Sequence, residues 1–207
     1  MYLVKTPWWL KTLYGKDLTW TIDTAEKEVF LTFDDGPHPS ITAFVLDCLK
    51  VYNARATFFC LGNNVEQFPE TYRRILDEGH RVGNHTYSHL NGWKTDDKVY
   101  FDDIARAKNF IDSNLFRPPY GRMTKFQAQH LQSVFRVVMW DVLSADFDKK
   151  VTKEQCLANV MKNAKAGSIV VFHDSEKAFP SLEYVLPKAL TFFAENGYAM
   201  KTIDAGK

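Results

Sequence analysis

Short runs of apolar, β-branched and aromatic residues recur along the chain, and polar or turn-forming residues bound most of them. Runs of this length and composition are typical of buried β-strands. We expect about seven strands, over Val29–Phe33, Ala56–Leu61, Arg81–Asn84, Leu115–Arg117, Val134–Val142, Ser168–His173 and Tyr198–Ile203.

The segments between these runs carry apolar residues at helical spacing. In ITAFVLDCLKVY, for example, Ile41, Val45 and Leu49 fall on one face. PETYRRILDEG and PKALTFFAENG both end at glycine, the residue best suited to a left-handed helix cap. DDIARAKNFIDS and KEQCLANVMKNA fill two further gaps, and we expect Pro187 to start or kink the last helix.

Strands that alternate with helices predict the α/β class, with a parallel sheet and helices outside it. Such a sheet closes into a barrel or stays open, and the pattern alone leaves both forms available. The chain has 207 residues and no repeat or linker, so we expect a single domain over residues 1–207. Residues 1–28 would form an N-terminal, Trp-rich extension packed on or beside it.

Polar residues directly follow five of the predicted strands. VFLTF runs into Asp34-Asp35, RVGN into HTYSH, LF into RPPYG, VVMWDV into LSADF, and SIVVF into His173-Asp174. Reactive groups gather at the carboxyl ends of the strands in both open and closed α/β sheets. We therefore expect these five polar clusters to form one layer.

His85 and His89 are four residues apart, a spacing that puts two imidazoles on one face of a helical turn. An Asp-Asp strand end in the same layer strengthens the interpretation as a metal site. Two nitrogens and one carboxylate leave a coordination position open, as in catalytic zinc sites. One aspartate could then bind the metal while the other acts as a base, and Arg117 is a candidate partner for that base.

His173 ends one of the most apolar runs in the chain. Its place in the polar layer favours a general acid over a hydrogen-bonded core histidine. Asp146 or Asp174 could orient it. We expect the three remaining histidines to face solvent: His38, His80 and His130.

The charge and the cysteine content of the chain bear on its binding partners and on its compartment. The formal net charge is +1, so nothing favours binding to nucleic acid. The three cysteines have no paired spacing and are interpreted as core thiols, which weakly favours a reducing compartment or one that needs no disulfides: Cys48, Cys60 and Cys156.

The N-terminal segment MYLVKTPWWLKTLYGKDLTW shows neither a cleavable signal peptide nor a run long enough to cross a bilayer. We expect its apolar residues to pack against the core, with peripheral membrane contact through residues 1–20 as the alternative. The residues concerned are Trp8, Trp9, Leu10, Leu13, Tyr14 and Trp20.

Taken in order, the motifs TFDDGP, HTYSH, RPPYG, SADF and VFHD resemble those of the polysaccharide deacetylase family, carbohydrate esterase family four. The resemblance covers roughly Val29 to Ile203. It implies a distorted TIM-like (β/α) barrel of about seven strands and helices. It also implies a metal-dependent hydrolase that removes N-acetyl groups from N-acetylglucosamine-type residues of a glycan, such as chitin oligomers or peptidoglycan, and releases acetate.

The resemblance assigns a role to each motif residue. The base, its arginine partner, the general acid and the carboxylate that tunes this acid would be Asp34, Arg117, His173 and Asp146. The ligands of a divalent metal, zinc foremost but also Co²⁺ or another divalent ion, would be Asp35, His85 and His89, in a loop braced by Ser88. The residues at the oxyanion and substrate would be Tyr120, through its backbone N–H, with Pro119, Val171 and Phe147.

Three positions depart from the family pattern. Phe147 stands where the fourth motif usually has tryptophan, Leu143 where many members have an acidic residue, and Val171 where leucine is frequent. These departures affect substrate choice rather than reaction type. Trp93 could stack on a sugar face or pack on its own loop.

Two other functions stay open at this stage. One is a metal-dependent C–N hydrolase that acts on a non-sugar amide, and the other is a glycan-binding pseudoenzyme. We expect a monomer. The family function points to the cell envelope, whereas the sequence by itself favours a cytoplasmic or peripherally membrane-associated protein.

Overall fold

The computed structural model describes residues 3–13 and 18–204. The strands are β1 (Glu28–Asp34), β2 (Thr57–Cys60), β3 (Arg81–Asn84), β4 (Leu115–Phe116), β5 (Arg136–Val137), β6 (Val142–Leu143), β7 (Ile169–His173) and β8 (Ala199–Met200). The helices are α1 (Trp8–Leu13), α2 (Ile41–Val51), α3 (Gly62–Gln67), α4 (Pro69–Asp77), α5 (Asp97–Lys108), α6 (Lys125–Gln132), α7 (Lys153–Asn163) and α8 (Phe179–Glu195). Two 3₁₀ turns, η1 (Gly92–Lys94) and η2 (Pro119–Gly121), complete the list.

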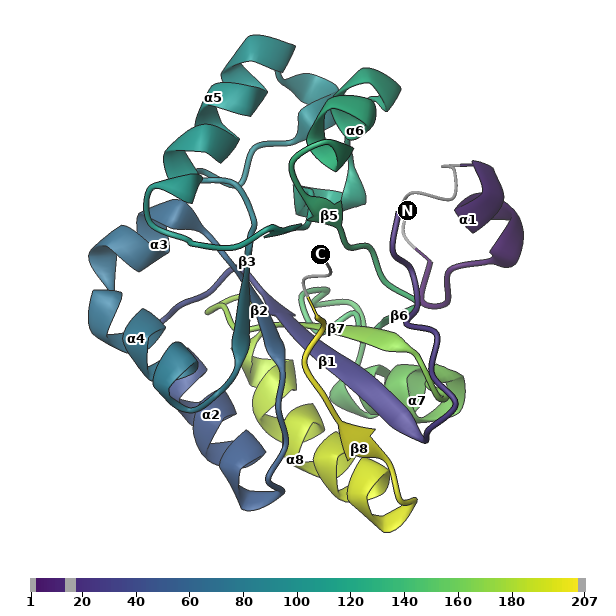
Figure 1. The fold of residues 1–207 in the computed structure, drawn as a ribbon. Coiled ribbons are helices and arrows are strands. Elements are labelled where there is room, and N and C mark those ends of the chain that lie inside the picture. The colour runs from purple at the N-terminus through teal and green to yellow at the C-terminus, as the bar shows by residue number, and fades with distance from the viewer. Residues whose placement is uncertain (1–2, 14–17, 205–207) are drawn as a thin grey trace.

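The strands form one parallel sheet in the order β5-β4-β3-β2-β1-β7-β6, and β8 pairs in parallel with β1. The sheet curls and the helices lie outside it, which confirms the predicted distorted α/β barrel (Figure 1). The N-terminal segment pairs with the backbone near both edge strands of this sheet. Thr19 forms a bridge with Val138, next to β5, and Lys5 forms a bridge with Val142 in β6.

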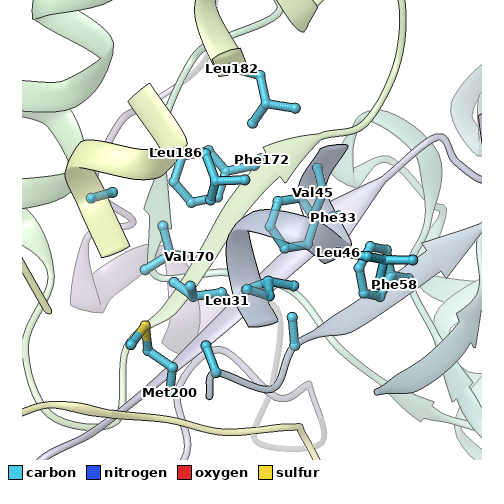
Figure 2. Close-up of a cluster of buried hydrophobic side chains, with 14 of the residues drawn as sticks. Leu31, Phe33, Val45, Leu46, Phe58, Val170, Phe172, Leu182, Leu186 and Met200 are labelled. Carbon is cyan, nitrogen blue, oxygen red and sulfur yellow. The ribbon is translucent and has the colours of Figure 1, made fainter. Parts of the chain in front are cut away.

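Strand β1 separates two apolar layers. Because successive side chains of a strand point to opposite faces, Val29, Leu31 and Phe33 pack against the helices. Figure 2 shows Leu31 and Phe33 in this layer, beside residues of α2, α8 and the neighbouring strands: Val45, Leu46, Phe58, Val170, Phe172, Leu182, Leu186 and Met200.

The alternate residues of β1 point into the barrel. Phe30 belongs to a separate interior cluster with Phe59 of β2, Leu115 of β4 and Ile169 of β7, and with two residues that follow β5 and β8, Val138 and Ile203. Thr32 and Asp34 continue this inward series and are buried. The strand therefore carries Asp34 to the carboxyl-end mouth of the barrel, as its alternation requires.

The prediction of one strand over Val134–Val142 is wrong, since the chain leaves the sheet between β5 and β6. The backbone there bonds to other partners: Val138 and Met139 carbonyls accept hydrogen bonds from Arg117, and the Met139 N–H donates to Thr19. In a continuous strand, these carbonyl and N–H groups would form hydrogen bonds with a neighbouring strand of the sheet. The buried arginine and the N-terminal segment take its place.

Two helices begin earlier than expected. Helix α8 begins at Phe179, so the prediction that Pro187 starts it is wrong, and Pro187 lies inside the helix. A proline in the first helical turn loses no backbone bond, and Pro180 takes that position. Helix α5 begins at Asp97, where Asp96 caps two backbone N–H groups, and ends at Lys108, before the NFIDS end of the predicted segment DDIARAKNFIDS. Neither α3 nor α6 was predicted.

His80 is buried, so the prediction that it faces solvent is wrong. Its Nδ1 accepts a hydrogen bond from the Ala56 N–H at 3.2 Å, and its ring meets the Phe58 ring edge-on. Burial, followed by the charge of Arg55, lowers the pKa of His80 to about 4. His38 is half-buried and His130 is exposed.

The N-terminal segment is divided between core and surface. Trp20 is buried, whereas Trp8 and Trp9 are 78% and 53% exposed. The side chains of Leu10 and Leu13, and all of Tyr14, lie outside the described residues. No helix in the described ranges has the length and apolarity needed to cross a bilayer.

The cysteines are free thiols. Cys60 and Cys156 are buried, as expected of core thiols, and Cys48 is half-buried.

Candidate active site

The two adjacent aspartates diverge because the backbone turns between them. Asp34 is the last residue of β1 and lies in register with His173 of β7. Asp35 has a φ of 80°, in the left-handed region that a residue with a side chain rarely adopts. A strained backbone of this kind persists only where its surroundings hold it. Here the Gly36 N–H donates to the Asp174 carboxylate, and the Asn64 amide donates to the Asp35 carbonyl.

Asp34 forms a buried ion pair with Arg117, whose Nη1 lies 2.6 Å from Asp34 Oδ1. Arg117 also donates to the Thr32 hydroxyl at 2.8 Å and to the carbonyls of Met139 at 3.0 Å and Val138 at 3.2 Å. A buried charge is tolerated only when it is paired and hydrogen-bonded. Both conditions are met, so Asp34 is held in one place.

Asp35 faces the two histidines of the next motif. Its Oδ1 lies 3.2 Å from His89 Nε2 and 3.7 Å from His85 Nε2. These three residues offer one ligand atom each, and the atoms all lie within 4.8 Å of one another.

The loop from His85 to His89 is not helical, so the prediction of a helical turn is wrong. Thr86 and His89 have φ values of 69° and 59°. The two rings nevertheless converge, with centroids 5.2 Å apart. Irregular backbone, rather than helical periodicity, therefore brings the two imidazoles together.

Side chains from outside the motif hold this loop. Asp103 of α5 accepts hydrogen bonds from the backbone N–H groups of Tyr87 and Ser88 and from the Ser88 hydroxyl. Asn84 accepts the Thr86 N–H at 2.8 Å. Sequence reasoning included Ser88 but missed Asp103, which no local pattern distinguishes from other surface acids on a helix.

The donor set fits a divalent cation. Asp35 Oδ1 is buried and has no hydrogen-bond partner among the described residues. His85 Nδ1 lies 2.8 Å from the Arg117 carbonyl, so Nδ1 carries the proton and Nε2 keeps its lone pair. Burial lowers the pKa of His85 to about 4, which leaves the ring neutral, as a metal ligand must be. Two imidazoles and one carboxylate suit zinc and similar ions.

The ionisation of Asp35 agrees with that role. Burial raises the pKa of its carboxyl group, but contact with His89 and the charges of His173 and His85 lower it by more. The net pKa lies well below the ordinary value. Asp35 is therefore a carboxylate at neutral pH.

His173 is oriented by Asp146 and not by Asp174. Asp146 Oδ1 lies 2.8 Å from His173 Nδ1, and its Oδ2 accepts the His173 N–H at 2.8 Å. Burial lowers the pKa of His173, but the Asp146 carboxylate and then Asp35 and Asp34 outweigh it and raise the pKa to about 9. Asp174 points elsewhere, toward Gly36 and Thr42.

These groups open into one cavity of about 810 Å³. Its lining includes five of the polar residues described above: Asp34, Asp35, His85, His89 and His173. The polar layer predicted from the strand ends thus borders a single space, although Arg117 and Asp146 are not among the described residues that line it.

The model of the polysaccharide deacetylase family matches residues 21–134, more than half of the chain. The chain belongs to the polysaccharide deacetylase family. As a member it is a hydrolase that acts on C–N bonds other than peptide bonds.

Proteins with similar sequences carry names that agree with membership of this family. Two peptidoglycan-N-acetylglucosamine deacetylases of Bacillus cereus are 36% and 34% identical to this chain, over 79% and 90% of its length. The chain spans 64% of the first and 91% of the second. A crystal structure of a peptidoglycan N-acetylglucosamine deacetylase superposes with a TM-score of 0.84 at 33% identity, over 90% of this chain and 91% of that one.

Three of the four residues that the resemblance assigns to the oxyanion and substrate line the cavity. Tyr120, Phe147 and Val171 line it, and the Phe147 ring meets the His173 ring edge-on at 5.0 Å. Tyr120 has a φ of 61°, and its hydroxyl lies 3.1 Å from His89 Nδ1. Pro119 is buried and is not among the described residues that line the cavity.

Proposed function

We propose that this chain removes the acetyl group from N-acetylglucosamine-type residues of a glycan of the peptidoglycan type. The observation that carries the proposal is the division of the two carboxylates. Asp35 faces His85 and His89, and Asp34 is paired with Arg117, in the cavity that His173 also lines. The names of the relatives support the choice of glycan.

Asp35, His85 and His89 would hold a divalent ion, with zinc as the first candidate and Co²⁺ as another. When bound, such an ion supplies Lewis-acid chemistry, which polarises the acetyl carbonyl. The chain's own contribution is to keep the His85 imidazole neutral and the Asp35 carboxylate ionised, as the lowered pKa of each group favours.

Asp34 would act as the general base and take the proton of the attacking water. Its position at the end of β1 and its hydrogen bond from Arg117 hold the carboxylate at the cavity wall. The backbone N–H of Tyr120 would donate to the oxyanion, an interaction that usually supplies a large share of catalysis. Pro119 would restrict the chain before the strained Tyr120.

His173 would protonate the leaving amine. Its pKa of about 9 keeps it charged at neutral pH, and Asp146 holds its Nδ1. The opposite nitrogen, Nε2, then carries the proton for the amine. Val171 and Phe147 would form the apolar wall for the acetyl methyl group.

Two substitutions distinguish the role of the base from the role of the metal ligands. Asp34→Asn is expected to keep the metal and to lose about 10²–10⁴-fold in turnover, since it removes the base. His85→Ala is expected to lose the metal as well as the turnover. The measurements are metal content and acetate release from an N-acetylglucosamine oligomer, with circular dichroism to show that each variant is folded.

The outcomes discriminate between functions. An Asp34→Asn enzyme with near-normal turnover would overturn the assignment of the base. Tight glycan binding by the zinc-loaded wild type without acetate release would instead favour a binding protein. Activity on simple amides but on no glycan would favour the other C–N hydrolase.

We also propose that the protein is a monomer that acts in the cell envelope, and that its N-terminal segment contacts the membrane. Membrane contact would depend on the exposed Trp8 and Trp9, because Lys5 and Lys11 both bind Asp141 instead of facing lipid. Flotation with anionic vesicles tests the contact, and it is rejected if the protein stays at the bottom of the gradient. Sedimentation velocity tests the monomer.

A further inference from the structure

The rim of the cavity carries an arginine that the chemistry above does not use. Arg122 lines the same cavity as Asp34 and Asp35 and is half-buried. Within the described ranges it forms no ion pair, and its guanidinium carbon lies 5.1 Å from the centre of the Trp93 ring. A guanidinium held on an aromatic face is placed for an anion.

Trp93 is a fixed platform and not a mobile surface ring. It is 54% exposed, yet its indole N–H donates to the Met123 carbonyl at 2.8 Å. Its backbone N–H donates to Asn91, which caps the η1 turn. The fully buried Gln127 donates to the carbonyl of Gly92, the residue next to Trp93.

Close packing also fixes the backbone at the residue before Trp93 and at the residue before Arg122. A Cβ on Gly92 would lie 2.7 Å from the Arg122 carbonyl, and a Cβ on Gly121 would lie 2.5 Å from the Trp140 ring. Only glycine allows these approaches. The platform and the cation are therefore built into the cavity wall together.

We propose that Trp93 and Arg122 form a subsite for a carboxylate-bearing sugar next to the sugar that loses its acetyl group. The sugar face would stack on Trp93, and its carboxylate would pair with the guanidinium. Within the described residues neither side chain pairs with Asp34, Asp35 or His173, the groups assigned to the acetyl group, so we place the acid on the neighbouring sugar. This proposal rests on the proposed deacetylase function and narrows its substrate to an acidic glycan.

The test uses one oligosaccharide in two charge states. Acetate release is measured on a peptide-free oligomer of alternating N-acetylglucosamine and N-acetylmuramic acid, and on the same oligomer with its carboxylates methyl-esterified. The wild type is expected to prefer the acid about tenfold in kcat/KM, the order of one charge-assisted hydrogen bond. Arg122→Gln is expected to bring this ratio to about one.

A matched control carries the same change elsewhere. Arg73→Gln removes an exposed arginine of α4 that pairs with Glu70 outside the cavity, and it is expected to keep the wild-type ratio. Trp93→Leu is expected to raise KM for both oligomers, and circular dichroism checks the folding of every variant.

The remaining outcomes overturn the proposal. Equal loss on acid and ester in Arg122→Gln would mean that Arg122 only supports the wall. A preference seen only when stem peptides are attached would place the carboxylate on the peptide and not on the sugar. If the zinc-loaded wild type releases no acetate from any glycan, the proposed function itself fails, which is a separate result.

Discussion

At the scale of single residues, one backbone angle separates the tasks of two neighbouring carboxylates. Asp34 continues the inward series of β1 and meets Arg117, whereas the φ of 80° at Asp35 turns its side chain toward His85 and His89. Like charges in adjacent positions would otherwise raise one pKa. Different partners remove the conflict, and the pKa of Asp35 is lowered instead.

The burial of His80 makes the stability of the fold depend on pH. The pKa of His80 in the folded chain is about 4, below its ordinary value of 6.5. Between these values the unfolded chain binds a proton that the folded chain does not, so His80 favours the fold fully above pH 6.5. That contribution is lost as the pH falls from 6.5 to 4.

His80→Asn is therefore expected to flatten the acid side of the stability profile. Asparagine keeps an acceptor for the Ala56 N–H but does not titrate. Urea unfolding at pH 7 and pH 4.5 measures the effect. The dependence should shrink but not vanish, because the pKa of His85 is also about 4. Identical pH dependence in both proteins would refute the role of His80.

At the scale of elements, the N-terminal segment is bound to the barrel through one buried carboxylate. Asp141 accepts hydrogen bonds from Lys5 at 2.5 Å, Lys11 at 2.8 Å and Ser168 at 2.7 Å. The segment also adds backbone bonds beside β6, between Leu143 and Val4 and between Thr6 and Asp141. Leu3 and Thr6 then reach the wall of the cavity.

Asp141→Asn is expected to loosen this segment and to destabilise the fold by about 1–3 kcal/mol. The value is below that of a fully buried pair because both lysines are partly exposed. Thermal unfolding gives the loss, and faster tryptic cleavage at Lys5 and Lys11 shows its location. Asp77→Asn, an exposed change at the end of α4, serves as the control. Unchanged cleavage would show that the ion pairs do not hold the segment.

At the scale of the whole molecule, the parallel sheet brings the candidate ligands together from two separate strand ends. Asp35 follows β1, and His85 and His89 follow β3. An ion bound by all three would bind only the folded chain, so it would stabilise the fold by mass action.

Zinc is therefore expected to raise the melting temperature of chelator-treated protein. At about 100 times its Kd the gain is about 2.7 kcal/mol, which corresponds to roughly 5–10 °C for a chain of this size. Differential scanning fluorimetry with and without zinc measures it. His89→Ala should abolish the shift, whereas the exposed His130→Ala should keep it. A full shift in His89→Ala would exclude this ligand set.

Local pattern alone accounted for much of the molecule. The apolar run over Val29–Phe33 predicted β1 and placed Asp34 at its end, and β3 has the predicted bounds. All five predicted strand-end clusters contribute residues to the lining of one cavity, because parallel strands end at the same edge, although Arg117 and Asp146 are not among the described residues that line it.

Tertiary structure decided what local pattern could not contain. Asp103, which holds the histidine loop, and Thr32, which binds Arg117, act across long stretches of chain. Burial made His80 a core residue, and bonds from Arg117 and the N-terminal segment broke the predicted strand over Val134–Val142. Sequence periodicity determined which residues face inward. Contacts between distant segments, which carry no local signal, decided how those residues pair.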